Sequence, residues 1–227
     1  RICEWGYELI KHDFSTFDLF GKWGMEMNPF VTRDGWHFYD RSKTSAEVVK
    51  MLYGAIYEVA KEYNVIIIGC NTIGHLGAGL MQVNRTGDDT SGYTWGRTRR
   101  MGVNTLAFRL PHHDTFYHVD ADCVGILGNI KWKLNRQWAD CLAESGTPLF
   151  VSAKPGVLTE EEKEDLHQIM LKASEQKAHK VPVDWQENDC PEIWQEGDEV
   201  LTYSWYEDEG NIPESNNQLY TIMIPLS

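Results

Sequence analysis

Short apolar runs alternate with longer amphipathic segments along this chain of 227 residues, and the alternation limits the folds open to it. The clearest apolar run goes from Val65 to Ile68 and contains only aliphatic residues. Such a run is typical of a strand buried on both faces. The segment before it opens with Thr44 and Glu47, the spacing of a capping box, and then places apolar residues at helical intervals. Strands and helices in this order predict βαβ units with parallel strands.

The same alternation continues along most of the chain. We expect strands at residues 7–10, 65–68, 81–84, 116–119 and 149–151. We expect helices after Thr44 and at residues 97–110, 131–144 and 159–176, with a glycine-rich turn or short helix at 74–79. Residues 14–43 form a long loop rich in Gly, Trp and Phe, and loops of this length inside a compact domain are usually functional.

Five strand–helix units are too few for a closed eight-stranded barrel, which takes about 250 residues. An open doubly wound sheet and the C-terminal portion of a barrel therefore both fit the pattern. The composition changes near residue 180, after which Pro, Trp, Glu and Asp become frequent. We accordingly divide the chain into an α/β portion at residues 1–178 and the start of a β domain at 179–227, with strands at 200–206 and 220–224.

The overall charge restricts the partners that we expect. A formal net charge of −13 disfavours nucleic acids and anionic membranes. No apolar run approaches the roughly 20 residues that span a bilayer. The five cysteines are scattered without a CxxC pair, so we predict reduced thiols rather than a zinc site or a disulfide framework. The chain begins at Arg1 without Met, and we expect further residues to precede it in the natural protein.

Two aspartates follow predicted strands and are candidates for catalysis. Asp13 ends the first strand, and Lys11, one pleat earlier, faces the same side and would keep Asp13 ionised. Asp88 follows the third strand. Parallel strands in a barrel bring their carboxyl ends together, where barrel enzymes place their active sites. The two carboxylates could thus face each other across a substrate.

The motif from Lys11 to Asp13 resembles the Lys-x-Asp nucleophile motif of the alpha-galactosidase (melibiase) group of retaining alpha-glycosidases. The segment from Arg85 to Ser91 resembles the acid/base loop of this group and of related alpha-glucosidases, in which an Asp follows a Gly. The resemblance implies that Asp13 is the nucleophile and Asp88, rather than Asp89, the acid/base. It further implies that Arg85 binds near the 2-hydroxyl of the sugar or orients Asp88.

The resemblance extends to other residues that would line the sugar pocket. Cys70 stands where alpha-galactosidases often carry a cysteine, although the residues from Asn71 onward differ from the family pattern. We expect the substrate-binding residues to be Lys11, Cys70, Asn71, Arg85, Asp89, Asp120 and Trp36. Trp23 and Trp36 in the long loop either stack on sugar or anchor the loop.

The resemblance implies an α/β fold that is the C-terminal portion of a (β/α)8 TIM barrel, followed by a short all-β segment. It implies double displacement on an alpha-linked glycoside substrate, with no cofactor and no metal. A carbohydrate is the expected partner, together with a missing N-terminal barrel half or a partner chain.

Two other functions remain open at this point. A half-barrel that has lost catalysis could serve as a sugar-binding or assembly module. A metal-dependent hydrolase or isomerase barrel could use a cluster of histidines and aspartates, which has the residue types of a divalent metal site. That cluster comprises His112, His113, His118, Asp120 and Asp122.

Overall fold

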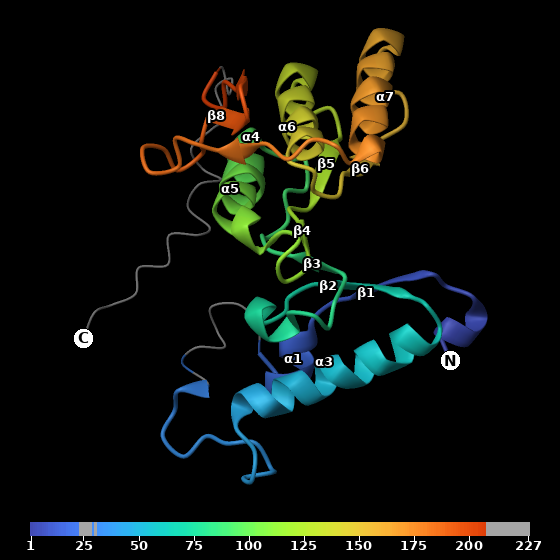
Figure 1. Cartoon of the computed structure of the whole chain (residues 1–227), viewed down its shortest axis with the longest axis vertical. Coiled ribbons are helices and arrows are strands. Elements are labelled where there is room, and N and C mark those ends of the chain that lie inside the picture. The colour runs from blue at the N-terminus through green and yellow to red at the C-terminus, as the bar shows by residue number, and fades with distance from the viewer. Residues whose placement is uncertain (23–28, 30, 208–227) are drawn as a thin grey trace.

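The computed structural model describes residues 1–22, 29 and 31–207. Within these residues four strands form a parallel sheet in chain order (Figure 1). The strands are β1 (Leu9–His12), β2 (Ile66–Gly69), β3 (Val83–Arg85) and β4 (His118–Asp120). The expected parallel α/β fold is thus confirmed, with strand bounds shifted by one or two residues.

One further parallel strand was absent from the sequence prediction. β5 (Cys123–Ile126) begins after only Ala121 and Asp122, and it pairs in parallel with β6 (Phe150–Ala153). Asp122 has a φ of 70°, so the chain bends between β4 and β5. β4 and β5 therefore act as one broken strand, of which the first half extends the four-stranded sheet and the second half pairs with β6.

The loop after β3 packs closely against β5. A Cβ on Gly125 would lie 2.5 Å from the Cα of Gly92, so neither position has room for a side chain. Thr90 adds two hydrogen bonds, from its N to Asp122 Oδ2 at 2.7 Å and from its Oγ1 to the carbonyl oxygen of Cys123 at 2.6 Å. These contacts fix the loop that carries Asp88.

The long helix α3 (Ser45–Glu62) starts at the capping box that the sequence predicts. Thr44 accepts a hydrogen bond from the Glu47 backbone, and Glu47 accepts one from the Thr44 backbone. The helix lies along β1 and β2 in the lower half of Figure 1 and buries Val49 and Tyr53. The loop expected at residues 14–43 is wrong at its start, because α1 (Ser15–Phe20) forms there.

The helices of the second half lie above and beside β4, β5 and β6 in Figure 1. A continuous helical stretch comprises α4 (Trp95–Thr98), the π-helix η4 (Arg99–Asn104), α5 (Thr105–Arg109) and η5 (Leu110–His112). This helical stretch has a glycine at position 102, where a side chain has no room, because a Cβ there would lie 2.8 Å from the ring of Trp138. The remaining helices are α6 (Trp132–Glu144), α7 (Glu160–Glu175), η1 (Cys3–Trp5) and η3 (Gly74–Gly77).

The C-terminal part forms an antiparallel sheet of β7 (Val181–Pro182), β8 (Ile193–Glu196) and β9 (Glu199–Thr202). Only β9 was expected from the sequence. In β7 and β8, Pro182, Pro191 and the acidic residues obscure the alternation of apolar and polar residues. Trp194 and Trp205 are fully buried in the same core cluster as α4 and α6. The strand expected at residues 220–224 lies outside the described residues.

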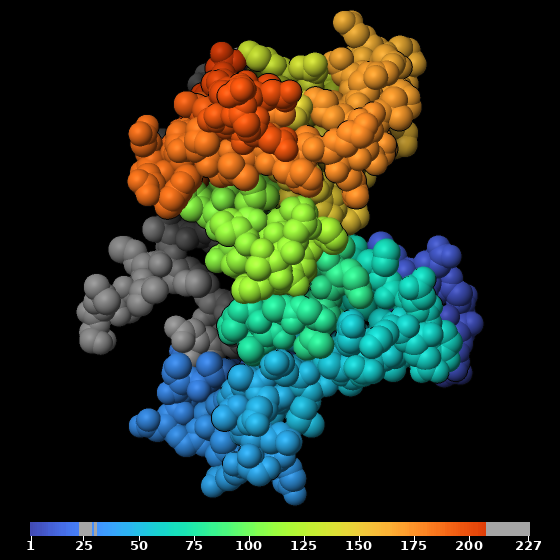
Figure 2. Space-filling view, in the orientation of Figure 1, coloured from blue at the N-terminus to red at the C-terminus, as the bar shows by residue number. Residues whose placement is uncertain are grey.

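Two core clusters hold the chain together, one around α3 and one around α4 to α7. They correspond to the lower and upper lobes of the space-filling view (Figure 2). The strand β2 is buried except at its first residue. The side chain of that residue, Ile66, is 44% exposed on the side away from α3. The expectation that this strand is covered on both faces is therefore wrong at Ile66.

The five cysteines are all unpaired in the structure. Among the described residues, every helix is too short or too polar to cross a bilayer.

Candidate active site

The parallel register aligns four chemically active side chains across the sheet. His12 lies opposite Gly69, Gly69 opposite Asn84, and Arg85 opposite Asp120. The backbone N of Cys70 also donates to the His12 carbonyl oxygen at 2.9 Å. Asp13, Cys70, Arg85 and Asp120 consequently follow one another across β1 to β4 at the level where the four strands end.

Asp13 is held in place by donors from two strand ends. Its Oδ1 accepts a hydrogen bond from Asn71 Nδ2 at 2.6 Å and one from the backbone N of Phe14 at 2.7 Å. Partial burial acts to raise the pKa of Asp13. Hydrogen bonds from Asn71, Cys70 and the Phe14 backbone, and the charge of Lys11, outweigh that effect and lower the pKa below 3.8. Asp13 is therefore a carboxylate at neutral pH, as a nucleophile must be.

The loops after β1 and β2 are tied to each other beneath Asp13. The carbonyl oxygen of Asn71 accepts a hydrogen bond from Thr16 N at 3.3 Å and one from Ser15 Oγ at 3.2 Å. The hydroxyl of Tyr53 in α3 lies 3.3 Å from Ser15 Oγ and accepts from Ile73 N at 3.0 Å. Asn71 has a φ of 50°, a conformation that asparagine tolerates better than most residues. The site is thus braced by buried hydrogen bonds.

Arg85 connects β3 to the carboxylates around it. Its side chain is 8% exposed, and Nη1 lies 3.3 Å from Asp122 Oδ1 while Nη2 pairs with Asp89. Its Nε donates to the Gly87 carbonyl oxygen at 3.2 Å. A guanidinium fixed in this way can present its remaining face to a hydroxyl group of a ligand.

Asp120 and Cys70 are the buried members of the row. Burial raises the pKa of Asp120, whose Oδ1 accepts a hydrogen bond from the backbone N of Asp122 at 2.7 Å. Burial also raises the pKa of the Cys70 thiol to about 11, so Cys70 is a neutral thiol. The charges of Lys11 and Arg85 act in the opposite direction on both groups. The environments of Asp13 and Asp120 thus shift the pKa values of these two carboxyl groups in opposite directions.

Asp88 and Asp89 point to different partners. Asp88 Oδ2 lies 3.1 Å from Arg97 Nη2, whereas Asp89 pairs with Arg85. The Asp88 side chain is 47% exposed. Asp89 is therefore joined to the strand-end row through Arg85, and Asp88 stands on the side of the loop that faces α4.

The sequence prediction missed two residues of this arrangement. Asp122 was not among the expected substrate-binding residues, but it pairs with Arg85 and accepts a hydrogen bond from Thr90 N. Asp122 follows a predicted strand, within the motif from Asp120 to Asp122, and this position was the signal that could have identified it. Arg97 was treated as a helix residue, and no motif marked it as a partner of Asp88.

Trp36 is partly buried and packs against the core cluster around α3. Its ring centroid lies 5.9 Å from that of Phe20 and 5.0 Å from that of Phe38. These contacts correspond to the expected role of loop anchor. Trp23 lies outside the described residues.

The histidine cluster is separate from the aspartates that were expected to complete it. His113, Asp114 and His118 bring their ligand atoms within 4.8 Å of one another. His118 is the first residue of β4 and Asp120 the last, so the histidines lie at the opposite end of the strand. The ring of His113 also accepts a hydrogen bond from Val119 N at Nδ1, 3.1 Å away. The metal site that combines His112, His113 and His118 with Asp120 and Asp122 is therefore wrong as a single centre.

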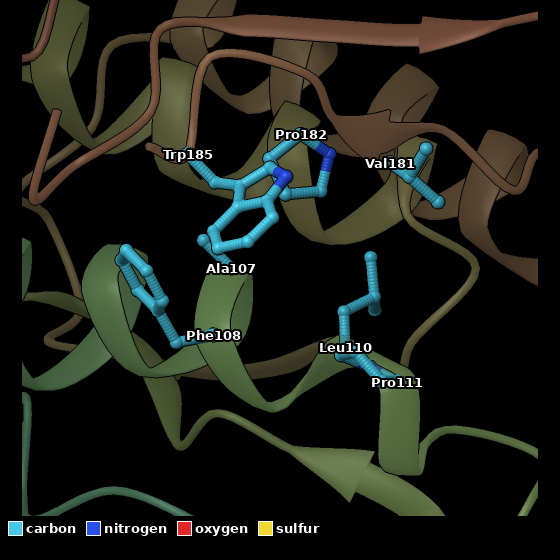
Figure 3. Close-up of a pocket in the computed structure, with 7 residues that line it drawn as sticks. All are labelled: Ala107, Phe108, Leu110, Pro111, Val181, Pro182 and Trp185. Carbon is cyan, nitrogen blue, oxygen red and sulfur yellow. The ribbon is translucent and has the colours of Figure 1, made fainter. Parts of the chain in front are cut away.

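An apolar pocket of about 290 Å³ lies apart from the strand ends (Figure 3). The side chains of Phe108 and Leu110 form one wall, and Pro182 and Trp185 face them across the space. None of its lining residues follows a strand of the parallel sheet, and all are uncharged. This pocket lacks the groups that glycoside chemistry needs.

Comparisons with known proteins give a likeness in structure only. No protein-family model and no curated protein matches the chain. The structure of alpha-galactosidase I from Mortierella vinacea matches 88% of this chain and 49% of its own, with a TM-score of 0.52 and 11% identity. The alpha-galactosidase of Saccharomyces cerevisiae matches 69% of this chain and 43% of its own, with a TM-score of 0.49 and 13% identity.

The chain thus spans less than half the length of both of these proteins. At 11% identity the likeness to the Mortierella enzyme shows the fold: an α/β arrangement with parallel strands that corresponds to part of an alpha-galactosidase.

Proposed function

We propose that this chain carries the catalytic residues of a retaining alpha-glycosidase similar to alpha-galactosidases. The observation that supports it best is the ionised carboxylate of Asp13, held by Asn71 and the Phe14 backbone at the end of a parallel strand. The fold shared with part of an alpha-galactosidase supports the same proposal.

The proposed reaction has two displacements. Asp13 attacks the anomeric carbon, and the bond to the leaving oxygen breaks as Asp88 donates a proton to that oxygen. The product is a β-linked glycosyl ester of Asp13. Asp88 then removes a proton from water, which attacks the same carbon and releases Asp13.

The neighbouring residues would bind the sugar. We assign hydroxyl contacts to Arg85 and Asp120, which lie in the same row as Asp13, and to Lys11, which precedes Asp13 by two residues on β1. Cys70 would line the pocket as a neutral thiol. Asn71 uses its amide nitrogen on Asp13, so its Oδ1 is the atom open to a sugar.

The acid/base assignment has a competitor in Asp89. A retaining pair needs its carboxyl groups about 5–5.5 Å apart, and Arg85 draws Asp89 toward the strand ends. Asp88 reaches the substrate only if its pair with Arg97 opens. We keep Asp88 as the proposed acid/base and assign Asp89 to substrate binding, and the two roles are separable by experiment.

Initial rates on an aryl alpha-galactoside test the proposal. Asp13→Asn should abolish turnover, and Asp88→Asn should lower the rate about 10²–10⁴-fold, the usual contribution of general acid–base catalysis. Azide needs no general base, so it should restore turnover by Asp88→Asn and yield the alpha-glycosyl azide. If azide instead restores turnover by Asp89→Asn, then Asp89 rather than Asp88 is the acid/base. Full activity of Asp13→Asn would refute the mechanism.

We also propose that further βα units, from the same protein or from a partner chain, cover the open side of β1 and β2. Leu9 is 48% exposed and Ile66 44% exposed on that side. Among the described residues β1 pairs with β2 only, so its outer edge has unpaired backbone groups. The same observation favours a second candidate, a sugar-binding half-barrel that acts only within an assembly. Sugar binding that survives both Asp13→Asn and Asp88→Asn, with no turnover by the intact protein, would favour that candidate.

A further inference from the structure

A small pocket lies at the carboxyl ends of β5 and β6, between the first turns of α6 and α7. Its volume is about 170 Å³. The walls come from Ile126 at the end of β5, Ile130 and Trp132 at the start of α6, and Val157 after β6. We call this space the α6–α7 pocket. None of these residues has a part in the reaction proposed above.

Asn135 gives the α6–α7 pocket an unused hydrogen-bond acceptor. The residue lines the pocket, is 1% exposed, and donates from Nδ2 to the carbonyl oxygen of Gly125 at 3.1 Å. Its buried Oδ1 has no hydrogen-bond partner among the described residues. Buried acceptors are normally satisfied, so an orphan of this kind points to a donor supplied from outside the chain.

Glu162 supplies a second polar group on the opposite side. It lies in the first turn of α7, and its Oε2 accepts from Thr159 N at 2.9 Å in the capping box. That bond fixes the side chain where it lines the pocket and leaves Oε1 for a ligand. Lys131 also lines the pocket, so the two opposite charges of the lining favour a neutral ligand over an anion or a cation.

The dimensions and chemistry suit a sugar ring. At about 30 Å³ for each water molecule, the pocket has the room of five or six waters, more than a single bridging water needs. The aliphatic and indole walls match the apolar faces of a sugar, and Asn135 and Glu162 match its hydroxyl groups. We propose that the α6–α7 pocket binds one neutral sugar ring.

The pocket is connected to the candidate active site through the backbone. The Gly125 carbonyl that Asn135 binds lies against Gly92, in the same loop as Asp88 and Asp89. If the proposed function holds, the pocket is an accessory subsite for a longer glycan, and the choice of sugar as ligand rests on that function.

The test is a titration of the Asp13→Asn variant of the whole chain with D-galactose, followed by ¹H–¹⁵N NMR. The Trp132 indole and the Asn135 side-chain amide report on the pocket directly. Saturable shifts of both signals are expected. Val157→Phe places a larger side chain in the pocket, and it should weaken binding at least about tenfold, or about 1.4 kcal/mol, because the ring occupies the space of the sugar. Val183→Phe, at an exposed position outside the pocket, is the matched control and should bind as before.

Two results would overturn the proposal. Absence of saturable shifts would mean that the pocket holds ordered water only. Unchanged binding in Val157→Phe would place the sugar elsewhere. Because Asp13→Asn removes turnover, binding in the pocket is measured independently of hydrolysis. Saturable NMR shifts in this variant, without any activity in the unsubstituted protein, would refute the glycosidase and keep the subsite.

Discussion

Asn71 donates a hydrogen bond of 2.6 Å to Asp13 across 58 positions of sequence. The contact joins the ends of β1 and β2 and helps to lower the pKa of Asp13. It converts a strand-end aspartate into a fixed, ionised carboxylate, which is the main requirement for a nucleophile.

Removal of this contact should move the pH dependence of activity. Asn71→Gly deletes the amide and raises the pKa of Asp13, so the acidic limb of kcat/KM should shift to higher pH. The variant should also lose about 1.5–3 kcal/mol of stability, the usual contribution of a hydrogen bond to a charged group. A pH–rate profile measures the shift. Asn71→Ala serves for comparison, because it adds strain at the positive φ and should be less stable with the same profile. An unchanged acidic limb in both variants would contradict the role of Asn71.

Arg85 should contribute strongly to stability. Arg85→Met leaves Asp122, whose side chain is 15% exposed, without its cationic partner. Loss of one member of a buried pair costs about 3 kcal/mol or more. Urea unfolding measures the change. The matched surface pair is Arg136 with Asp165 at 3.2 Å, and Arg136→Met should cost less than about 1 kcal/mol. Equal effects of the two substitutions would show that Arg85 is not an organising residue.

The network around Glu144 predicts a pH dependence of stability. Burial acts to raise the pKa of Glu144, but hydrogen bonds and charges from Lys172 and Lys180 outweigh it and lower the pKa below 4.5. A carboxyl group with a depressed folded-state pKa stabilises the fold above its unfolded-state pKa, and the contribution disappears as the pH falls through the folded value. The free energy of unfolding should therefore exceed that of Glu144→Gln at neutral pH, and the difference should shrink below about pH 4.5. A difference that stays constant down to pH 3 would contradict this assignment.

The contact between Gly92 and Gly125 should tolerate no side chain. A Cβ on residue 125 would lie 2.5 Å from the Cα of Gly92, so Gly125→Ala must push the loop of Asp88 away from β5. We expect a loss of about 1–3 kcal/mol from overpacking, together with reduced activity. Gly54 lies within α3 with no atom near its Cβ position, and Gly54→Ala should stabilise the protein by up to about 1 kcal/mol. Thermal unfolding of the two variants should give shifts of opposite sign.

The sequence was sufficient for the parts of the fold that have local signals. The capping boxes at Thr44 and Thr159 mark the starts of α3 and α7, and the aliphatic run at 65–68 marks β2. β5 was missed because it follows β4 after two residues, without the turn or helix that normally separates parallel strands. Its bend depends on the positive φ of Asp122, which no spacing rule reveals.

The candidate site could be predicted in part, because several of its residues also have local signals in the sequence. Asp13, Cys70 and Arg85 end or follow strands, and parallel pairing alone places them in one row. The pairing of Asp88 with Arg97 and of Asp89 with Arg85 could not be predicted. Arg97 comes from a helix whose position is fixed by packing rather than by a motif.

Covalent trapping tests the central claim most directly. A fluorinated alpha-galactosyl inactivator with a good leaving group should accumulate as the glycosyl-enzyme on the intact protein, and mass spectrometry of its peptides should find the sugar on Asp13. Asp13→Asn should take up no label. Label on Asp120 or on another carboxylate, with Asp13 unmodified, would contradict the account.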